Sequence, residues 1–250
     1  MSGGRGDDRL LASDLTSYLS PRSVRPPATA GVCRDVVRMI VPEASRPLLH
    51  RLLTRAIAPH QRRRARLLAE RSPLRLDLGS GASPIPGWVN VDLVGHKPDL
   101  AWDLALPLPL ADGTVDAIFT EHLLEHLPLT TALDLIRECY RLLALGGTLR
   151  VGVPDAGAYL RAYDGDDQSF IEAARPGRPT RLLAVREVFQ EHGHRSAYDF
   201  QTLALFFEAS GFRSVDRRSS GESRIQPCPD SEHRRQETLY VEGIKPGSSA

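Results

Sequence analysis

Apolar runs that stop at turn residues predict a sheet in this protein. Leu74, Leu76 and Leu78 form a short apolar run that stops at the Gly-Ser-Gly of residues 79–81. This pattern indicates a buried strand that runs into a glycine turn. Further strands are predicted at 88–92, 100–104, 114–120, 148–153, 211–215 and 238–244. We expect the last two to pair antiparallel.

Helical spacing separates several of these strands. Residues 129–143 keep apolar positions three and four apart and contain the capping pattern Thr131-x-x-Asp134, so they predict a helix that Gly146-Gly147 ends. Two further helices are predicted, over 182–189 and from Ser196 or Asp199 to Ser210. Strands and helices in this order are typical of an α/β protein.

Residues 1–72 form an arginine-rich block that prolines interrupt. Two helix faces are predicted there, one with Val32, Val36, Val37 and Ile40, the other with Leu48, Leu49, Leu52, Leu53 and Ile57, with breaks at Pro42, Pro47 and Pro59. We expect this extension to pack on a domain at 73–250 and to offer a homodimer surface. The arginine cluster at 62–66 favours a solvated helix face over nucleic-acid binding, because no aromatic residue for stacking accompanies it.

The composition is typical of a globular protein and disfavours a disulfide-rich or membrane-spanning one. The 250 residues are 41% hydrophobic and 25% charged, with a net charge of +1, as in an ordinary globular protein. Cys33, Cys139 and Cys228 are too few and too widely spaced for a disulfide framework, which suits a reduced cytoplasm. No apolar run approaches the ~18 residues of a membrane span, and the N-terminus does not resemble a signal peptide. We therefore expect a cytoplasmic protein without a membrane partner.

The glycine turn and the next carboxylate predict a nucleoside site. Asp92 ends the second predicted strand, and open α/β sheets bind ligands at that edge, where a carboxylate can accept both ribose hydroxyls. The dinucleotide fingerprint requires a third glycine, but Pro84 stands there. Only ten residues separate Gly81 from Asp92, too few for a full crossover helix and a strand. A ribose without a pyrophosphate fits this spacing better.

The glycine turn and the second predicted strand resemble those of a known protein family. Residues 76–81 (Leu-Asp-Leu-Gly-Ser-Gly) and 86–92 (Pro-Gly-Trp-Val-Asn-Val-Asp) resemble the class I S-adenosylmethionine-dependent methyltransferases, in particular the bacterial type 11 branch with its abbreviated first helix. The Leu-Glu-His element of 124–126 is similar to the same branch. The resemblance to this family rests on specific motifs over residues 74–155 and is looser over residues 198–245. The resemblance implies a Rossmann-like, mostly parallel sheet of seven strands with the last antiparallel, and helices on both faces.

The resemblance also implies the cofactor and its site. The cofactor would be S-adenosyl-L-methionine, with S-adenosyl-L-homocysteine as product. The matching cofactor-binding positions are Asp77, Gly79, Ser80, Gly81, Asp92, Leu93, Asp103, Leu104, Thr120, Glu121 and His122, with Asp103 and Leu104 at the adenine end. An insertion at about 156–196 would face the methyl group, and the candidate substrate-binding residues in or beside it are Tyr159, Tyr163, Arg195 and Tyr198.

Histidines are the candidate general bases. His192 and His194 lie in a polar stretch, where solvation or capping explains them as well as proton transfer does. His194 is the first choice, His192 the second, and His122 at the end of the fourth predicted strand the third. His126 is expected to be structural, and Glu125 to brace the loops. The predicted reaction is O-methylation of a small molecule, such as a glycosyl or secondary-metabolite intermediate, by direct displacement.

Two other functions stay open. His122-x-x-Glu125-His126 is the inverted zinc-peptidase pattern, so a zinc hydrolase would bind its metal through His122 and His126. The position of the motif directly after a strand in an α/β core disfavours this interpretation, and no metal is predicted. A non-catalytic S-adenosylmethionine-binding subunit would act with a partner chain, for which the N-terminal extension offers a surface.

Overall fold

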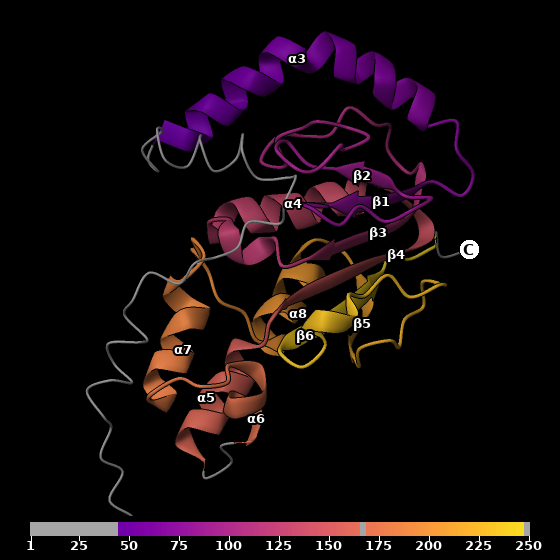
Figure 1. The fold of residues 1–250 in the computed structure, drawn as a ribbon. Helices are drawn as coiled ribbons and strands as arrows, with labels where there is room; N and C mark the ends of the chain where they lie inside the picture. Colours follow the sequence, from indigo (N-terminus) through magenta and orange to yellow (C-terminus); the bar gives the residue numbers. More distant parts are fainter. Residues whose placement is uncertain (1–44, 166–168, 248–250) are drawn as a thin grey trace, which may run out of the picture.

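The computed structural model describes residues 45–165 and 169–247 (Figure 1). Its elements in chain order are α3 (Arg46–Leu68), β1 (Arg75–Leu78), β2 (Val89–Val91), β3 (Val115–Glu121), η2 (Leu124–His126), α4 (Leu129–Leu142), β4 (Leu143–Pro154), α5 (Ala156–Asp164), α6 (Ser169–Ala174), α7 (Arg181–Gln190), α8 (Phe200–Ala209), β5 (Arg213–Arg218), η3 (Glu232–Arg234) and β6 (Thr238–Ile244). The predicted helix face of Val32, Val36, Val37 and Ile40 lies outside these residues.

The sheet has the order β2-β1-β3-β4-β6-β5. Strand β1 pairs parallel with β2 and β3, and β3 pairs parallel with β4, so these four strands end at one edge. Strand β6 runs antiparallel to both β4 and β5, which confirms the antiparallel pairing of the last two strands. The fold is therefore the predicted α/β, Rossmann-like class.

The sheet has six strands in the described residues, because the predicted strand at 100–104 is reduced to one bridge between Val91 and Leu100. Beyond Leu100 the backbone bonds to helix α3 instead of to a strand. Ala101 N donates to Gln61 Oε1 at 3.1 Å, and Asp103 N donates to Thr54 Oγ1 at 3.2 Å. Both acceptors are buried side chains of α3, which thereby covers the edge of the sheet.

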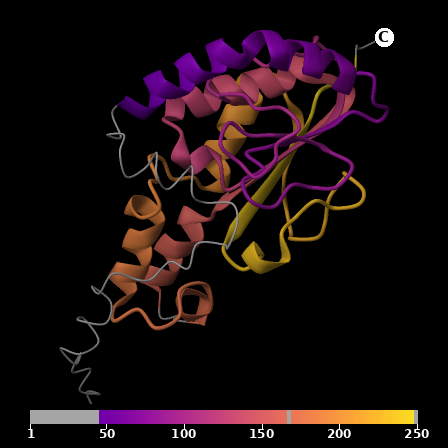
Figure 2. The same ribbon diagram turned by 45° about the horizontal axis from the view of Figure 1, so that its top comes forward.

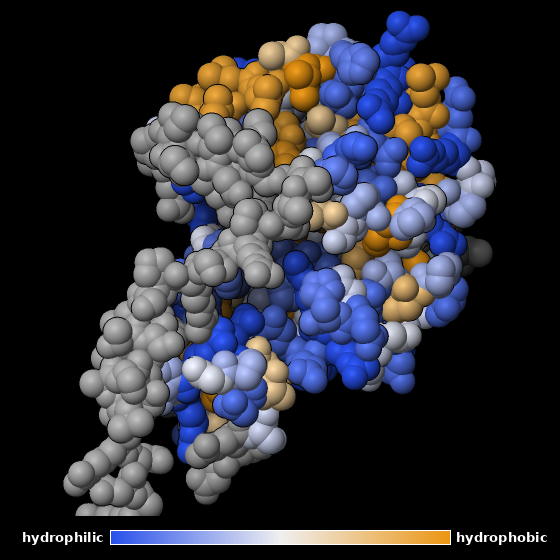
Figure 3. Space-filling view, in the orientation of Figure 1, coloured by the Kyte–Doolittle hydropathy of each residue, from blue (hydrophilic) through white to orange (hydrophobic). Residues whose placement is uncertain are grey.

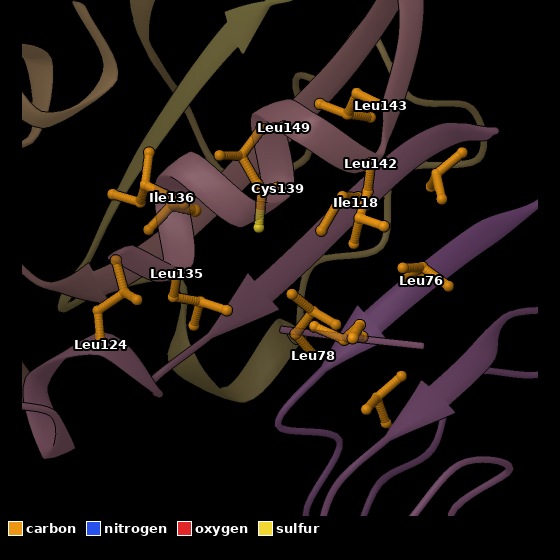
Figure 4. Close-up of a cluster of buried hydrophobic side chains, with 14 of the residues drawn as sticks. Leu76, Leu78, Ile118, Leu124, Leu135, Ile136, Cys139, Leu142, Leu143 and Leu149 are labelled. Carbon is orange, nitrogen blue, oxygen red and sulfur yellow. The ribbon is translucent and has the colours of Figure 1, made fainter. Parts of the chain in front are cut away.

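The two faces of the sheet are covered differently. One face carries the main core, in which strand residues such as Leu76, Ile118 and Leu149 pack with Leu135 and Leu142 of α4 (Figure 4). The other face has a smaller cluster made by Trp88, Ala117, Phe119, Ile225 and Tyr240. Loop segments cover this second face (Figure 2). The expectation of helices on both faces is therefore not met here, because the connection from β1 to β2 is too short to contain one.

Helix α3 is continuous although Pro59 lies inside it, so the break predicted there is wrong. A proline removes one backbone donor, and the packing of Ala65 and Leu68 in the main core holds the C-terminal turns of the helix in place. Pro47 falls in the first turn, where the missing N–H group costs little. The N-terminal half exposes Leu48, Leu49, Leu52 and Leu53, and apolar residues gather on this part of the surface (Figure 3).

Most predicted helices are confirmed, with differences at their ends. Helix α4 begins after Pro128 without a side-chain cap, so the capping role predicted for Thr131 and Asp134 is wrong. It ends at Leu142, where β4 begins at once, so Gly146 and Gly147 lie inside a strand and do not end the helix. Asp199, not Ser196, caps α8, because its side chain accepts from Thr202 N at 2.8 Å.

Helices α5, α6 and α7 form a small helical layer beside the sheet (Figure 1). Helix α7 confirms the predicted helix at 182–189, and Thr180 caps it. Helices α5 and α6 were not predicted. They pack with α7 around Tyr159, Ala184 and Val188 in a separate buried cluster. Among the described residues, no helix is both long and apolar enough to cross a membrane.

Candidate functional site

The turn after β1 depends on glycine. Gly79 and Gly81 have φ angles of 77° and 55°, in the left-handed region that favours glycine. A Cβ atom on Gly79 would lie 3.0 Å from Leu123 Cδ1, so the backbone also needs the space. Gly79 N donates to Val91 O at 2.8 Å, which ties the turn to the end of β2. We call the ends of β2, β1 and β3, with residues 79–81, 92–93 and 120–122, the ligand edge.

Asp92 lies against the glycine turn, as predicted. Its Oδ2 accepts from Gly81 N at 3.0 Å, and its Oδ1 accepts from Val94 N at 2.8 Å. Each carboxylate oxygen has a second lone pair, so Asp92 can still accept two hydroxyl groups. Two backbone donors thus fix the carboxylate that would hold a ribose. Leu93 follows directly on the chain.

Carboxylates concentrate at the ligand edge. Burial, together with the nearby negative charges of Glu121 and Asp92, raises the pKa of the Asp77 carboxyl to about 7. Glu121 is held by the Tyr240 hydroxyl, which donates to Oε1 at 2.6 Å, and by Ser231 N at 3.2 Å. Asp77 of β1, Asp92 directly after β2 and Glu121 of β3 therefore repel one another and favour a bound cation.

Two buried hydroxyl groups at the ligand edge have no partner. Ser80 Oγ and Thr120 Oγ1 are buried, and neither forms a hydrogen bond within the part of the chain that the structure describes. Buried polar groups are costly unless they are hydrogen-bonded. Together with the free lone pairs of Asp92 and the acidic charge, these orphaned oxygens fit a polar, cationic nucleoside such as S-adenosylmethionine.

The predicted adenine residues lie in a turn beside helix α3. Asp103 Oδ1 accepts from Ala105 N at 3.0 Å, and Asp103 O accepts from Leu106 N at 2.9 Å. Leu104 is partly buried against the main core. Their contact with adenine remains a prediction.

Sequence reasoning missed the segment that covers the glycine turn. His96 N donates to Gly81 O at 2.6 Å. A Cβ atom on Gly95 would lie 2.8 Å from both Asp92 Cβ and Gly81 O, so only glycine fits there. Gly95, three residues after Asp92, was the sequence feature that could have predicted this close contact.

His122 follows β3 in a strained conformation, with a φ angle of 53°. Its Nε2 lies 2.9 Å from Thr238 Oγ1, and that hydroxyl donates to Arg234 O at 2.7 Å. Nε2 must therefore carry the proton, and Nδ1 lies 3.3 Å from Glu125 Oε1. Burial lowers the pKa of His122 to about 4, so the ring is neutral at pH 7. Nε2 is bonded to Thr238, and the unprotonated Nδ1 faces the buried Glu125 side chain, which disfavours His122 as the general base.

His192 and His194 reach the same region from the loop after α7. The ring centroid of His194 lies 5.0 Å from that of His126 and 5.9 Å from that of His192. Arg195 N and Ser196 N both donate to Glu125 O, at 2.7 and 3.1 Å, so this loop is bonded to η2. The structure therefore brings the predicted catalytic histidines together beyond the end of β3.

The predicted substrate-binding residues divide into two pairs. Tyr159 is 0% exposed, and its hydroxyl donates to Glu237 Oε2 at 3.0 Å. Tyr198 is also buried, with its hydroxyl 3.4 Å from Leu124 O. Both rings pack in the core and both hydroxyls have partners within the protein, which disfavours acceptor contact by these two tyrosines. Tyr163 and Arg195 are exposed and keep their predicted role as a proposal.

Comparisons with known proteins match one segment of the chain to a family. Residues 96–151 match the family model of a methyltransferase domain. A search of curated proteins finds no match to the chain. Among solved structures, an S-adenosylmethionine-dependent methyltransferase from Archaeoglobus fulgidus has 14% identity and a TM-score of 0.45, covering 78% of this chain and 94% of its own. One from Thermotoga maritima has 16% identity and a TM-score of 0.43, covering 84% and 98%.

Structural similarity at this level assigns no residue role and no acceptor. The methyltransferase assignment rests on the matched family segment, which includes the turn with Asp103 and Leu104, β3, η2, α4 and most of β4. This segment lies beside the glycine turn and Asp92, which resemble the same family in sequence. The match over residues 96–151 of this α/β protein supports a class I methyltransferase domain that uses S-adenosylmethionine.

Proposed function

We propose that this methyltransferase transfers a methyl group to a hydroxyl oxygen of a small-molecule acceptor, such as a glycosyl or secondary-metabolite intermediate, in the cytoplasm. One observation supports binding of the methyl donor. Three carboxylates, Asp77, Asp92 and Glu121, lie at the ends of three adjacent parallel strands. The near-neutral net charge of the chain, +1, supports a small polar acceptor over a polyanion.

Each residue of the ligand edge has a role in this proposal. Asp92 accepts the two ribose hydroxyls with its free lone pairs. Asp77 and Glu121 provide negative charge toward the cationic end of the donor. Ser80 and Thr120 gain the partners that their buried hydroxyls lack. When bound, S-adenosylmethionine supplies a sulfonium methyl group that an acceptor oxygen attacks, with S-adenosylhomocysteine as the leaving group.

The protein mainly has to align the acceptor oxygen with the methyl carbon. Orientation of this kind can supply on the order of 7–11 kcal/mol of the barrier in favourable cases. An alcohol also loses its proton during or just after attack, so a neutral histidine must receive it. His192 and His194 are the proposed bases, because Nε2 of His122 is bonded to Thr238 and its Nδ1 faces the buried Glu125.

A methyl-transfer screen tests the proposal. Purified protein with S-adenosylmethionine is offered matched sets of small alcohols, amines and carboxylic acids, and S-adenosylhomocysteine formation is followed by mass spectrometry. The proposal expects turnover with members of the alcohol set. Turnover confined to the amines or the carboxylates would overturn O-methylation while leaving the methyltransferase assignment intact.

We also propose a homodimer through the N-terminal helices. The exposed leucines of α3, namely Leu48, Leu49, Leu52 and Leu53, support it, because helix faces of this kind usually pack against another surface. Sedimentation of the full chain tests it. A dimer that Leu52→Asp dissociates would agree with the proposal, and a monomer at all concentrations would contradict it.

A further inference from the structure

Three potential metal ligands meet where η2 faces the loop after α7. Glu125, His126 and His194 each offer one ligand atom, and these atoms all lie within 4.8 Å of one another. His126 and His194 are half-buried, and Glu125 is buried. The group differs from the zinc-peptidase pattern of the sequence, because His194 replaces His122.

The Glu125 carboxylate lacks the partners that a buried charge requires. The residue is 1% exposed, and neither carboxylate oxygen forms a hydrogen bond within the described part of the chain. The contact with His122 Nδ1, at 3.3 Å, is with the ring nitrogen that carries no proton. A buried carboxyl group is stable when it is protonated, paired, hydrogen-bonded or bound to a metal. Both Glu125 oxygens are therefore available as ligands for a cation that the two histidines also face.

His194 is oriented as a metal ligand. Its Nδ1 lies 2.7 Å from Val188 O. A carbonyl oxygen can only accept, so Nδ1 carries the proton, and the lone pair of the neutral ring is on Nε2. Histidines that bind metals commonly donate their other N–H group to a carbonyl in this way, which fixes the tautomer and the ring orientation.

The two segments that carry the ligands are held together independently of any metal. Arg195 N and Ser196 N donate to Glu125 O. Ser196 Oγ also donates to Leu127 O at 2.7 Å. The ligands therefore sit on a preformed frame, and a metal would not have to gather them from distant positions.

We propose that Glu125, His126 and His194 bind a zinc ion. Two imidazoles and one carboxylate suit zinc, whereas calcium and magnesium prefer oxygen ligands alone. Three protein ligands leave a fourth position for water or for an acceptor oxygen, and the latter role rests on the proposed function. With its Nε2 on the metal, His194 cannot accept a proton, which leaves His192 as the base.

Metal titration tests the site with zinc alone as the probe. Full-length protein is freed of metal with a chelator and titrated with zinc chloride against a chromophoric competitor. One zinc per chain is expected, with affinity reduced about 100-fold or more in Glu125→Gln and in His194→Ala. His60→Ala, an exposed histidine of α3, is the matched control and should bind as the wild type does.

Cobalt provides a second measurement. The visible spectrum of the cobalt-substituted protein should show nitrogen and oxygen ligands in a site of low coordination number, and Glu125→Gln should alter it. Thermal unfolding of the metal-free variants shows whether each is folded. The proposed site would be wrong if the folded wild type bound no stoichiometric zinc. It would also be wrong if His60→Ala lost as much zinc affinity as the ligand variants. S-Adenosylhomocysteine binding, measured on the same samples, tests the proposed function independently of the zinc site.

Discussion

The ligand edge and the histidine group beyond it are built in different ways. At the ligand edge, Gly79, Gly81 and Asp92 belong to one short stretch of chain, and backbone donors fix their geometry. The histidines come from η2 and from the loop after α7, which meet only in the folded protein. The first region therefore follows from local sequence, and the second depends on tertiary packing. This difference decides which substitutions should affect donor binding and which should affect transfer.

The largest effect is expected from His192→Ala. Loss of a general base typically lowers turnover by about 10²- to 10⁴-fold, and kcat on an alcohol from the acceptor screen measures it. Affinity for S-adenosylhomocysteine should stay unchanged, because His192 belongs to the histidine region. His60→Ala is the control. A variant with full kcat would remove His192 from the mechanism.

Gly79→Ala should weaken the ligand edge through the backbone. A left-handed φ costs a residue with a Cβ atom about 1–2 kcal/mol, and the contact with Leu123 adds to this cost. Thermal unfolding and donor affinity should both decrease. Gly87→Ala is a matched control, because Gly87 has a φ of 81° with no atom within 4 Å. Equal losses in the two variants would argue against the Leu123 contact.

Asp77 predicts a pH dependence of donor binding. Its pKa of about 7 means that the carboxyl is mostly protonated at pH 6 and ionised at pH 8. A cationic donor favours the ionised form, so affinity for S-adenosylmethionine should rise about tenfold from pH 6 to pH 8. Asp77→Asn should bind more weakly at pH 8 and lose this dependence. A flat wild-type profile would contradict the charge role of Asp77.

The same raised pKa has the opposite effect on stability. A carboxyl whose folded pKa lies above its unfolded value stabilises the fold below pH 4, and this stabilisation is lost as the pH rises toward 7. Asp77→Asn should therefore unfold at a higher temperature than the wild type at pH 8. At pH 4 the two proteins should be similar.

The smallest effect is expected at the covered sheet edge. Gln61→Ala removes the acceptor for Ala101 N and should lower the free energy of unfolding by about 1 kcal/mol. Gln201→Ala, at an exposed position of α8, should leave it unchanged. Chemical denaturation of both variants provides the comparison. A neutral Gln61→Ala would show that the edge has another source of hydrogen bonds.

Local patterns were enough to predict most of the sheet and the ligand edge. Alternating leucines, the Gly-Ser-Gly turn and Asp92 carry their information within a few residues. The strand predicted at 100–104 failed because Thr54 and Gln61, far earlier in the chain, take its hydrogen bonds. Both α3 acceptors are buried polar side chains, which no apolar pattern reveals.

The acceptor region was harder to predict for the same physical reason. Tyr159 and Tyr198 have polar hydroxyls, but their rings fill cores that form only when α5, α7 and η2 come together. The meeting of His194 with Glu125 likewise depends on a loop folding back onto η2. Spacing along the chain could identify His122 and His126 as candidate metal ligands, but it could not identify His194.

Calorimetry with S-adenosylhomocysteine tests the central claim most directly. The folded wild-type chain should bind one molecule, and Asp92→Ala should lose about 100-fold or more in affinity, because hydrogen bonds to a charged group contribute about 1.5–3 kcal/mol each. Asp134→Asn, an exposed carboxylate of α4, should bind as the wild type does. Absence of binding by the folded wild type, or full affinity in Asp92→Ala, would contradict the account.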